Sequence, residues 1–195
     1  MNQKPIVFLD MDGVLVDFVG GLQRALGLPY DAAKYPYKHG NYEMFPEAVA
    51  ATNGRHTMDS LIKECHTIRF WEDLKWERRG SDVLEIVESY SDQVYLTSYP
   101  MKDPVAWLGK LRWIERCLPQ YMNKVILMTV HKRLLANPNA ILLDDRDDNV
   151  DQFCAAGGHG WLIPQPWNTQ HAICDRDWTV LLESWMKCAC KMISN

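Results

Sequence analysis

Short hydrophobic runs alternate along this chain with longer segments that mix hydrophobic and polar positions. Five runs have the length and β-branched content of buried strands, and they cover residues 6–9, 94–96, 125–128, 140–143 and 160–163. Helices are predicted over residues 16–26, 81–90 with Ser81 as N-cap, 103–117, 149–156 and from about Trp178 onward. Strands that alternate with helices predict an α/β fold with a parallel sheet and right-handed crossovers.

Residues 18–74 interrupt this alternation. Residues 28–54 are rich in Tyr, Pro, Gly and His and do not have the composition of a sheet strand, whereas residues 57–67 have a helical pattern. We therefore predict two units. An α/β core is formed by residues 1–17 and 75–195, and a small, mostly helical cap subdomain, residues 18–74, is inserted after the first strand.

The first hydrophobic run ends in two aspartates and a glycine, Asp10, Asp12 and Gly13. In open α/β sheets, ligands bind at the carboxyl ends of the parallel strands. Two carboxylates in one place are unfavourable unless a cation or a bound proton compensates their charge. A hard divalent cation with oxygen ligands, Mg2+ foremost, would do so. On its own, this pattern is more often a polar turn, so a metal site is indicated only if later strands bring further suitable groups.

Three later strands also end in polar groups that phosphoryl transfer needs. The hydroxyl of Thr97 and the ammonium of Lys132 can hold phosphate oxygens, and Asp144 with Asp145 can complete a metal site. Each group alone has an ordinary structural explanation, as a strand-end cap, a solvated basic turn or a polar loop. Together, each after a hydrophobic strand, they favour a phosphoryl-transfer site.

In such a site the two N-terminal aspartates have different tasks. Asp10 is the predicted nucleophile, which forms an aspartyl-phosphate and divides one difficult step into two. Asp12 is the predicted general acid, which protonates the leaving oxygen and later activates water.

Composition limits the partners and the compartment. The chain has 195 residues with 47% hydrophobic and 24% charged residues, as is usual for a globular protein. The formal charge of −4 argues against binding to extended nucleic acid, and no run has transmembrane length. Six cysteines without a CxxC pair, and no signal peptide, indicate reduced thiols and a cytoplasmic location. The sequence leaves a homodimer open.

The combined motifs resemble a known group of enzymes. Asp10-x-Asp12-Gly13, Thr97, Lys132 and Asp144-Asp145 are similar to the four motifs of the haloacid dehalogenase (HAD) phosphatase superfamily. A closer resemblance is to the 5'(3')-deoxyribonucleotidase family. It is carried by Asp12 to Phe18, Gly20-Gly21, Thr97-Ser98, Lys110 with Trp113, Asp144-Asp145-Arg146 and Pro166-Trp167-Asn168.

This resemblance implies a Rossmann-like HAD core and a Mg2+ cofactor. It makes Asp10 both nucleophile and metal ligand, and Asp12 the acid/base that also binds Mg2+ through its carbonyl group. Asp144 is the implied third protein ligand, and Asp145 beside it is a further candidate ligand.

The resemblance also implies residues that bind the substrate. The implied phosphate-binding residues are Thr97, Ser98, Lys110 and Lys132. The implied nucleobase cage contains Phe18, together with Phe70 or Trp71. Aromatic rings suit this task because every base offers a π face.

We therefore expect a Mg2+-dependent phosphoric monoester hydrolase of nucleotide metabolism that dephosphorylates nucleoside monophosphates, deoxyribonucleotides foremost. One alternative keeps the chemistry and changes the substrate to a sugar phosphate or a nucleic-acid end phosphate. Another alternative is a nucleotide-binding module without catalysis.

Overall fold

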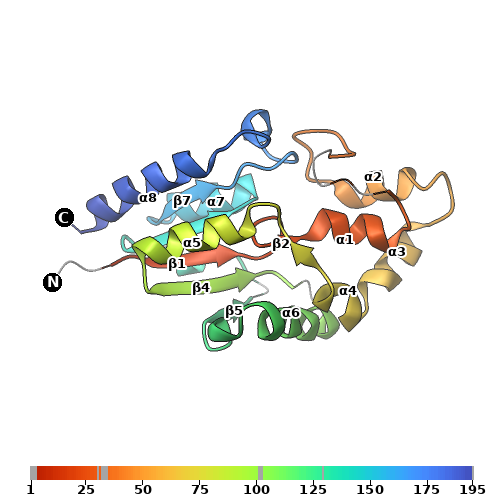
Figure 1. Ribbon diagram of the computed structural model, residues 1–195, viewed down its shortest axis with the longest axis horizontal. Helices are drawn as coiled ribbons and strands as arrows, with labels where there is room; N and C mark the ends of the chain where they lie inside the picture. Colours follow the sequence, from red (N-terminus) through yellow and green to blue (C-terminus); the bar gives the residue numbers. More distant parts are fainter. Residues whose placement is uncertain (1–3, 30, 32–34, 101–102, 129, 195) are drawn as a thin grey trace.

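A computed structural model of the chain describes residues 4–29, 31, 35–100, 103–128 and 130–194. Its main sheet is parallel, with the strand order β5-β4-β1-β6-β7 (Figure 1). The strands are β1 (Ile6–Asp10), β4 (Gln93–Ser98), β5 (Val125–Leu127), β6 (Ala140–Asp144) and β7 (His159–Leu162). Because β1 is the central strand, its carboxyl end lies beside the carboxyl ends of β4 and β6.

Helices cover both faces of the sheet. Alternate residues of a strand point to opposite faces, and accordingly Val7 and Leu9 belong to one hydrophobic cluster while Phe8 belongs to another. The first cluster includes side chains of α5 (Gly80–Tyr90), α6 (Pro104–Cys117) and α8 (Thr179–Ile193). The second includes side chains of α7 (Asp147–Ala155) and of the 3-10 helix η2 (Lys132–Leu135). The result is a three-layer α/β structure.

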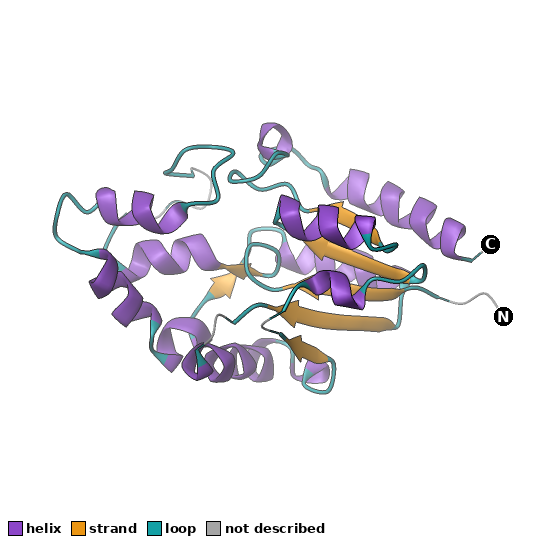
Figure 2. Cartoon of the chain, turned by 180° about the vertical axis from the view of Figure 1, so that it is seen from behind, coloured by secondary structure: helices purple, strands orange, loops and turns teal. Residues whose placement is uncertain are grey.

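A group of four helices lies beyond the carboxyl ends of the strands (Figures 1 and 2). These are α1 (Phe18–Ala25), α2 (Met44–Ala50), α3 (Met58–Cys65) and α4 (Ile68–Glu72). Leu22, Met44 and Leu61 of α1, α2 and α3 are buried in one hydrophobic cluster, which also contains Trp167 from the loop after β7, whereas Trp71 of α4 belongs to the cluster that includes Val7 and Leu9. Two further 3-10 helices, η1 (Pro119–Tyr121) and η3 (His171–Ile173), are the remaining helical elements of the described residues.

The chain passes into and out of this helical group through one short antiparallel ribbon. Strand β2 (Val16–Asp17) pairs with β3 (Lys75–Trp76), so the two crossings lie side by side. The Asp17 side chain then accepts a hydrogen bond of 2.7 Å from the Gly20 amide and caps α1. The ribbon coincides with the predicted cap boundaries, and the division into two units stays a prediction.

Helix α4 is tightly packed against α6. A Cβ atom on Gly109 would lie 2.4 Å from Trp71 Cβ and 2.8 Å from the Ile68 carbonyl oxygen, so only glycine fits there. The Trp113 indole also donates a hydrogen bond of 2.9 Å to the Leu74 carbonyl. These contacts fix one side of the helical group to the α/β layers.

The α/β fold is confirmed, and the predicted strands differ from the observed ones by at most two residues at an end. Helix α6 begins as predicted, because the Asp103 side chain accepts a hydrogen bond from Val105 and Pro104 follows the cap. The cap assigned to Ser81 is wrong, since α5 starts at Gly80 with Arg79 at its N-cap. Helix α2 lies in the aromatic stretch, where no helix was predicted. Among the described residues, no helix is long and apolar enough to cross a membrane.

Candidate active site

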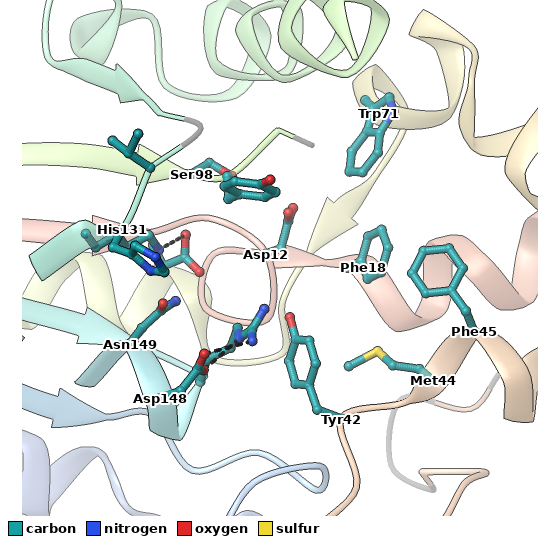
Figure 3. Close-up of a pocket in the computed structure, with 15 residues that line it drawn as sticks. Asp12, Phe18, Tyr42, Met44, Phe45, Trp71, Ser98, His131, Asp148 and Asn149 are labelled. Atoms are coloured by element: carbon teal, nitrogen blue, oxygen red, sulfur yellow. Dashed lines mark hydrogen bonds and ion pairs between the residues drawn. The ribbon is translucent and has the colours of Figure 1, made fainter. Parts of the chain in front are cut away.

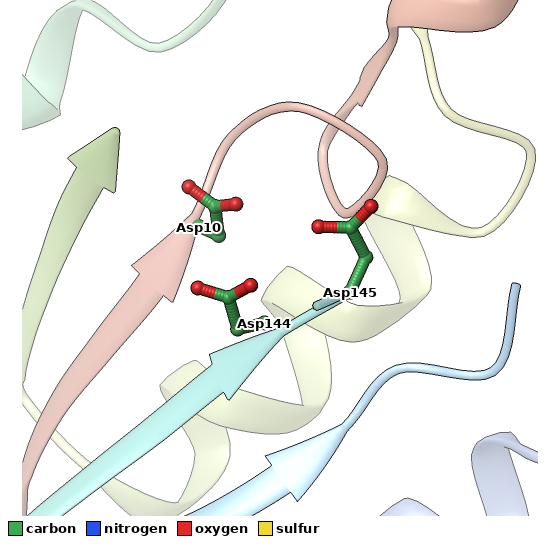
Figure 4. Close-up of side chains that lie close together, drawn as sticks. All are labelled: Asp10, Asp144 and Asp145. Atoms are coloured by element: carbon green, nitrogen blue, oxygen red, sulfur yellow. The ribbon is translucent and has the colours of Figure 1, made fainter. Parts of the chain in front are cut away.

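Three buried carboxylates meet at the ends of two neighbouring strands. Asp10 is the last residue of β1, Asp144 is the last residue of β6, and Asp145 follows directly (Figure 4). Each offers a carboxylate oxygen, and these oxygens all lie within 4.8 Å of one another. They meet because β1 and β6 are adjacent and parallel.

Lys132 lies between two of these carboxylates. Its Nζ is 2.6 Å from Asp10 Oδ1 and 2.6 Å from Asp144 Oδ2. Burial raises the pKa of Asp10 to about 7, against the opposing effect of Lys132. Burial and the charges of Asp144 and Asp10 raise the pKa of Asp145 well above its usual range. One ammonium therefore does not balance the three acids, and the all-oxygen donor set fits a hard divalent cation.

Neighbouring groups fix the orientation of the Asp144 and Asp145 carboxylates. The Asn149 amide donates to both oxygens of Asp144, at 3.1 and 3.0 Å, and the Arg146 backbone N–H donates to Oδ1 at 2.9 Å. The Trp167 indole donates to Asp145 Oδ2 at 2.6 Å. Asp145 Oδ1 is buried and has no hydrogen-bond partner among the described residues, which leaves an acceptor that a cation would satisfy.

Asp12 lies in the turn after β1 and has a different lysine. Lys110 Nζ, fully buried on α6, is 2.5 Å from Asp12 Oδ2 and 4.6 Å from the centre of the Trp71 ring. Asp10 and Asp12 therefore belong to separate ion pairs although they are two residues apart. The ammonium of Lys110 faces the Asp12 carboxylate. The contact of Lys110 with phosphate stays a prediction.

The end of β4 brings two hydroxyl groups to the same edge of the sheet. The side-chain oxygens of Thr97 and Ser98 are buried and have no hydrogen-bond partner within the described part of the chain. Buried polar atoms are normally paired, so the unpaired hydroxyl of Ser98, which lines the cavity described below, marks a place where a ligand can bind. Thr97 does not line this cavity, and its contact with phosphate stays a prediction.

A cavity of about 590 Å3 extends from Asp10, Asp12 and Ser98 toward the helical group (Figure 3). Its polar end includes side chains of Asp10, Asp12, Ser98, Lys132 and Asn149. Its other end is mostly aromatic or apolar and includes Phe18, Tyr42, Met44, Phe45 and Trp71. The cavity thus joins an ionic site to an aromatic one.

Two aromatic rings stack at the apolar end. Phe18 and Trp71 have ring centroids 5.6 Å apart and an interplanar angle of 17°. Phe70 packs edge-on against both, at 6.1 and 5.0 Å, but it does not line the cavity. It lines a separate open hollow together with Gly21 and Leu74. Phe18 and Trp71 therefore line the cavity, whereas Phe70 packs against both without lining it, and the nucleobase cage stays a prediction.

Sequence reasoning missed the side of the cavity formed by Tyr42. The Arg146 guanidinium lies 4.5 Å from the centre of the Tyr42 ring and makes two hydrogen bonds of 3.0 Å to Asp148. The resemblance included Arg146 in the Asp144-Asp145-Arg146 stretch but assigned it no task, and nothing in the sequence indicated Asp148. Tyr42 and Phe45 lie in an aromatic stretch with no periodicity to indicate which rings face a ligand.

Comparisons with known proteins agree with this geometry. The family described as 5' nucleotidase, deoxy (pyrimidine), cytosolic type C, matches residues 4–190. A predicted 5'(3')-deoxyribonucleotidase of Vibrio phage KVP40 is 30% identical over 148 residues, which cover 76% of this chain and 70% of that protein. The homodimer that the sequence left open finds no support in these comparisons.

Solved structures share the fold at low sequence identity. A HAD-like hydrolase from Xanthomonas campestris has a TM-score of 0.55 and 11% identity, and the match covers 98% of this chain and 96% of that one. A HAD family hydrolase from Deinococcus radiodurans, solved with bound phosphate and sodium, has a TM-score of 0.54 and 18% identity, with 97% of each chain covered. The chain therefore has the HAD hydrolase fold, belongs to the family of cytosolic type C 5'-deoxynucleotidases, and is a phosphoric monoester hydrolase.

Proposed function

We propose that this enzyme is a Mg2+-dependent phosphatase of nucleoside monophosphates, deoxyribonucleotides foremost, which works through an aspartyl-phosphate on Asp10. The observation that carries the proposal is the cavity that reaches the buried acidic cluster through Asp10 at one end and has stacked aromatic rings at the other. A nucleotide has the matching polarity, with an anionic phosphate and a flat base. The name of the phage relative supports the same substrate class.

The residues that would hold Mg2+ are Asp10, Asp144 and Asp145, with the Asp12 carbonyl as a further ligand. When bound, the ion supplies positive charge that reduces the repulsion between the phosphate and an attacking carboxylate. Lys132 supplies a second positive charge at the same place and holds Asp10 Oδ1. The hydroxyls of Thr97 and Ser98 are available to bind phosphate oxygens.

The reaction has two steps on this chain. The Asp10 oxygen that Lys132 does not hold attacks phosphorus, the phosphorus–oxygen bond to the nucleoside breaks, and Asp12 protonates the leaving oxygen. In the second step Asp12 takes a proton from water, the water oxygen attacks phosphorus, and the bond between phosphorus and the Asp10 oxygen breaks. Inorganic phosphate leaves and both aspartates return to their starting state.

The helical group supplies the nucleoside contacts in this proposal, and residues 18–74 act as the cap. The base stacks in the aromatic end of the cavity, against Phe18 and Trp71. A small nucleotide is the proposed partner. We place the enzyme in the cytoplasm, a compartment that keeps thiols reduced, in agreement with its six free cysteines.

Phosphate release from a panel of substrates tests the proposal. The panel contains deoxyribonucleoside and ribonucleoside monophosphates, a sugar phosphate and a 3'-phosphorylated oligonucleotide, each with Mg2+ and with EDTA. We expect turnover of mononucleotides that EDTA abolishes, and none with Asp10→Asn. Asp92→Asn is the matched control, because this exposed carboxylate pairs only with Lys4 among the described residues. Full activity of Asp10→Asn would exclude the proposed nucleophile, and preference for the sugar phosphate would exclude the nucleotide.

A further inference from the structure

Trp167 belongs at once to the acidic cluster and to the packing of the helical group. It lies in a loop after β7 and is 5% exposed. Its indole N–H donates to Asp145 Oδ2 at 2.6 Å, a buried hydrogen bond between residues 22 positions apart. Its ring is part of the hydrophobic cluster that contains Leu22 and Met44. One side chain thus contacts an acid of the site and the interior of the helical group.

The loop around Trp167 is anchored on both sides. Asn168 donates to the Asp145 and Ile163 carbonyl oxygens, both at 2.8 Å, and Gln165 donates to the Gly13 carbonyl at 2.5 Å. These bonds hold the loop of residues 165–168 next to Asp145 and Gly13, and they thereby fix where the Trp167 indole lies. The ring also packs against Tyr35 of the inserted segment, with centroids 5.6 Å apart.

Little space is left around the Asp145 carboxylate. A Cβ atom on Gly13 would lie 2.4 Å from Asp145 Oδ2 and 2.9 Å from the Trp167 ring. The carboxylate therefore lies between the Gly13 backbone and the indole. Its Oδ2 is occupied by the indole N–H, and Oδ1 is the oxygen without a partner among the described residues.

From these contacts we infer that Trp167 is a positioning residue for the metal site, which binds Oδ2 of Asp145 so that Oδ1 faces the cation. The inference rests on the proposed Mg2+ dependence. Partners of this kind act through the ligand, because they fix its orientation before the metal binds, and their loss typically lowers metal affinity about 10- to 100-fold. Trp167 does not touch the substrate in this account.

The test compares Mg2+ affinity of three proteins without substrate, by calorimetric titration and by the Mg2+ dependence of the melting temperature. Trp167→Phe keeps a large ring and removes the N–H. Trp161→Phe is the matched control, because the Trp161 indole N–H is buried without a hydrogen-bond partner among the described residues. We expect Trp167→Phe to bind Mg2+ roughly 10- to 100-fold more weakly and Trp161→Phe to bind it like the unaltered protein.

A double-mutant cycle separates positioning from general loosening of the packing. In an Asp145→Ala background the carboxylate is absent, so Trp167→Phe should cause no further loss of Mg2+ affinity. A further loss of equal size would contradict the inference, as would unchanged affinity of the single variant. Failure of the unaltered protein to bind Mg2+ would instead overturn the proposed function.

A measurement on the unaltered protein covers the case in which Trp167→Phe does not fold. In a 15N NMR spectrum, the indole N–H resonance of Trp167 should shift when Mg2+ is added, because its acceptor changes its bonding. The Trp161 resonance should not shift. Equal shifts of both resonances, or none at Trp167, would contradict the inference.

Discussion

Lys110 and Asp12 form an ion pair of 2.5 Å in which the lysine is fully buried and the aspartate side chain is 23% exposed. The lysine comes from α6, and its Nζ also lies over the indole ring of Trp71. The pair therefore fixes the Asp12 carboxylate at the cavity, close to where a leaving oxygen must be protonated. We therefore expect Lys110 to orient the carboxylate of Asp12, the proposed general acid.

Lys110→Met should lower kcat more than it raises KM. A general acid contributes about 10²- to 10⁴-fold, and an unheld carboxylate loses part of this, so we expect kcat to fall roughly 10- to 100-fold. Steady-state kinetics on a deoxyribonucleotide measure both constants, and Lys187→Met on the exposed side of α8 is the control. If Lys110 binds phosphate instead, inhibition by inorganic phosphate will weaken in the variant, and this result would replace our interpretation.

Gly13→Ala should damage the acidic cluster. Gly13 has a φ of +73°, and its new Cβ would lie 2.4 Å from Asp145 Oδ2. Gly27→Ala is a matched control, because Gly27 has a φ of +58° and no atom within 4 Å of the same position. The left-handed backbone costs each variant roughly 1–2 kcal/mol of unfolding free energy. Only Gly13→Ala should also weaken Mg2+ binding; equal affinity in the two variants would show that the contact is unimportant.

Phe18 and Phe70 should contribute differently to substrate binding. Phe18 lines the cavity and Phe70 stands behind it, so only Phe18→Ala removes a ring that can stack on a base. Base stacking contributes about 1–3 kcal/mol, hence KM should rise roughly 5- to 150-fold in Phe18→Ala and less in Phe70→Ala. Urea unfolding of both variants measures the packing that each ring loses. If KM rises more in Phe70→Ala than in Phe18→Ala, Phe70 contacts the base and the assignment made here is wrong.

Glu77 should make the unfolding free energy of the metal-free protein depend on pH. Burial raises the pKa of this carboxyl from 4.5 to about 7, and the nearby Asp17 acts in the same direction. Between these pKa values the folded state binds more protons than the unfolded state, so the free energy of unfolding falls as pH rises through this window. Glu77→Gln should remove this part of the pH dependence. Urea unfolding across the window measures it, with Glu85→Gln, an exposed residue of α5, as control.

The sequence predicted the sheet and the meeting of its acids for simple reasons. Buried parallel strands are continuous hydrophobic runs, and polar residues directly after them must gather at one edge. The sequence alone therefore places Asp10, Lys132 and Asp144 at one edge of the sheet. The start of α6 was equally clear, because Asp103 and Pro104 have the types that caps and first helical positions favour.

The aromatic end of the cavity could not be predicted in the same way. Phe70 and Trp71 are neighbours on α4, and successive helical residues point about 100° apart, so only the packing against α6 decides which ring meets the cavity. Gly109 is what lets Trp71 approach α6. Tyr42 and Arg146 meet although they are far apart in sequence, and neither has a local pattern that indicates its partner.

The pairing of β2 with β3 bears on how enzymes of this kind can diversify. Val16 pairs with Trp76 and Asp17 with Lys75, so the chain departs from and rejoins the sheet layer at adjacent points. The segment between β2 and β3 therefore starts and ends at the same place, so its length and sequence can change without altering the register of the main sheet. Evolution can exchange side chains such as Tyr42 and Phe45 there, and so alter the accepted molecules, while the reactive carboxylates stay in place.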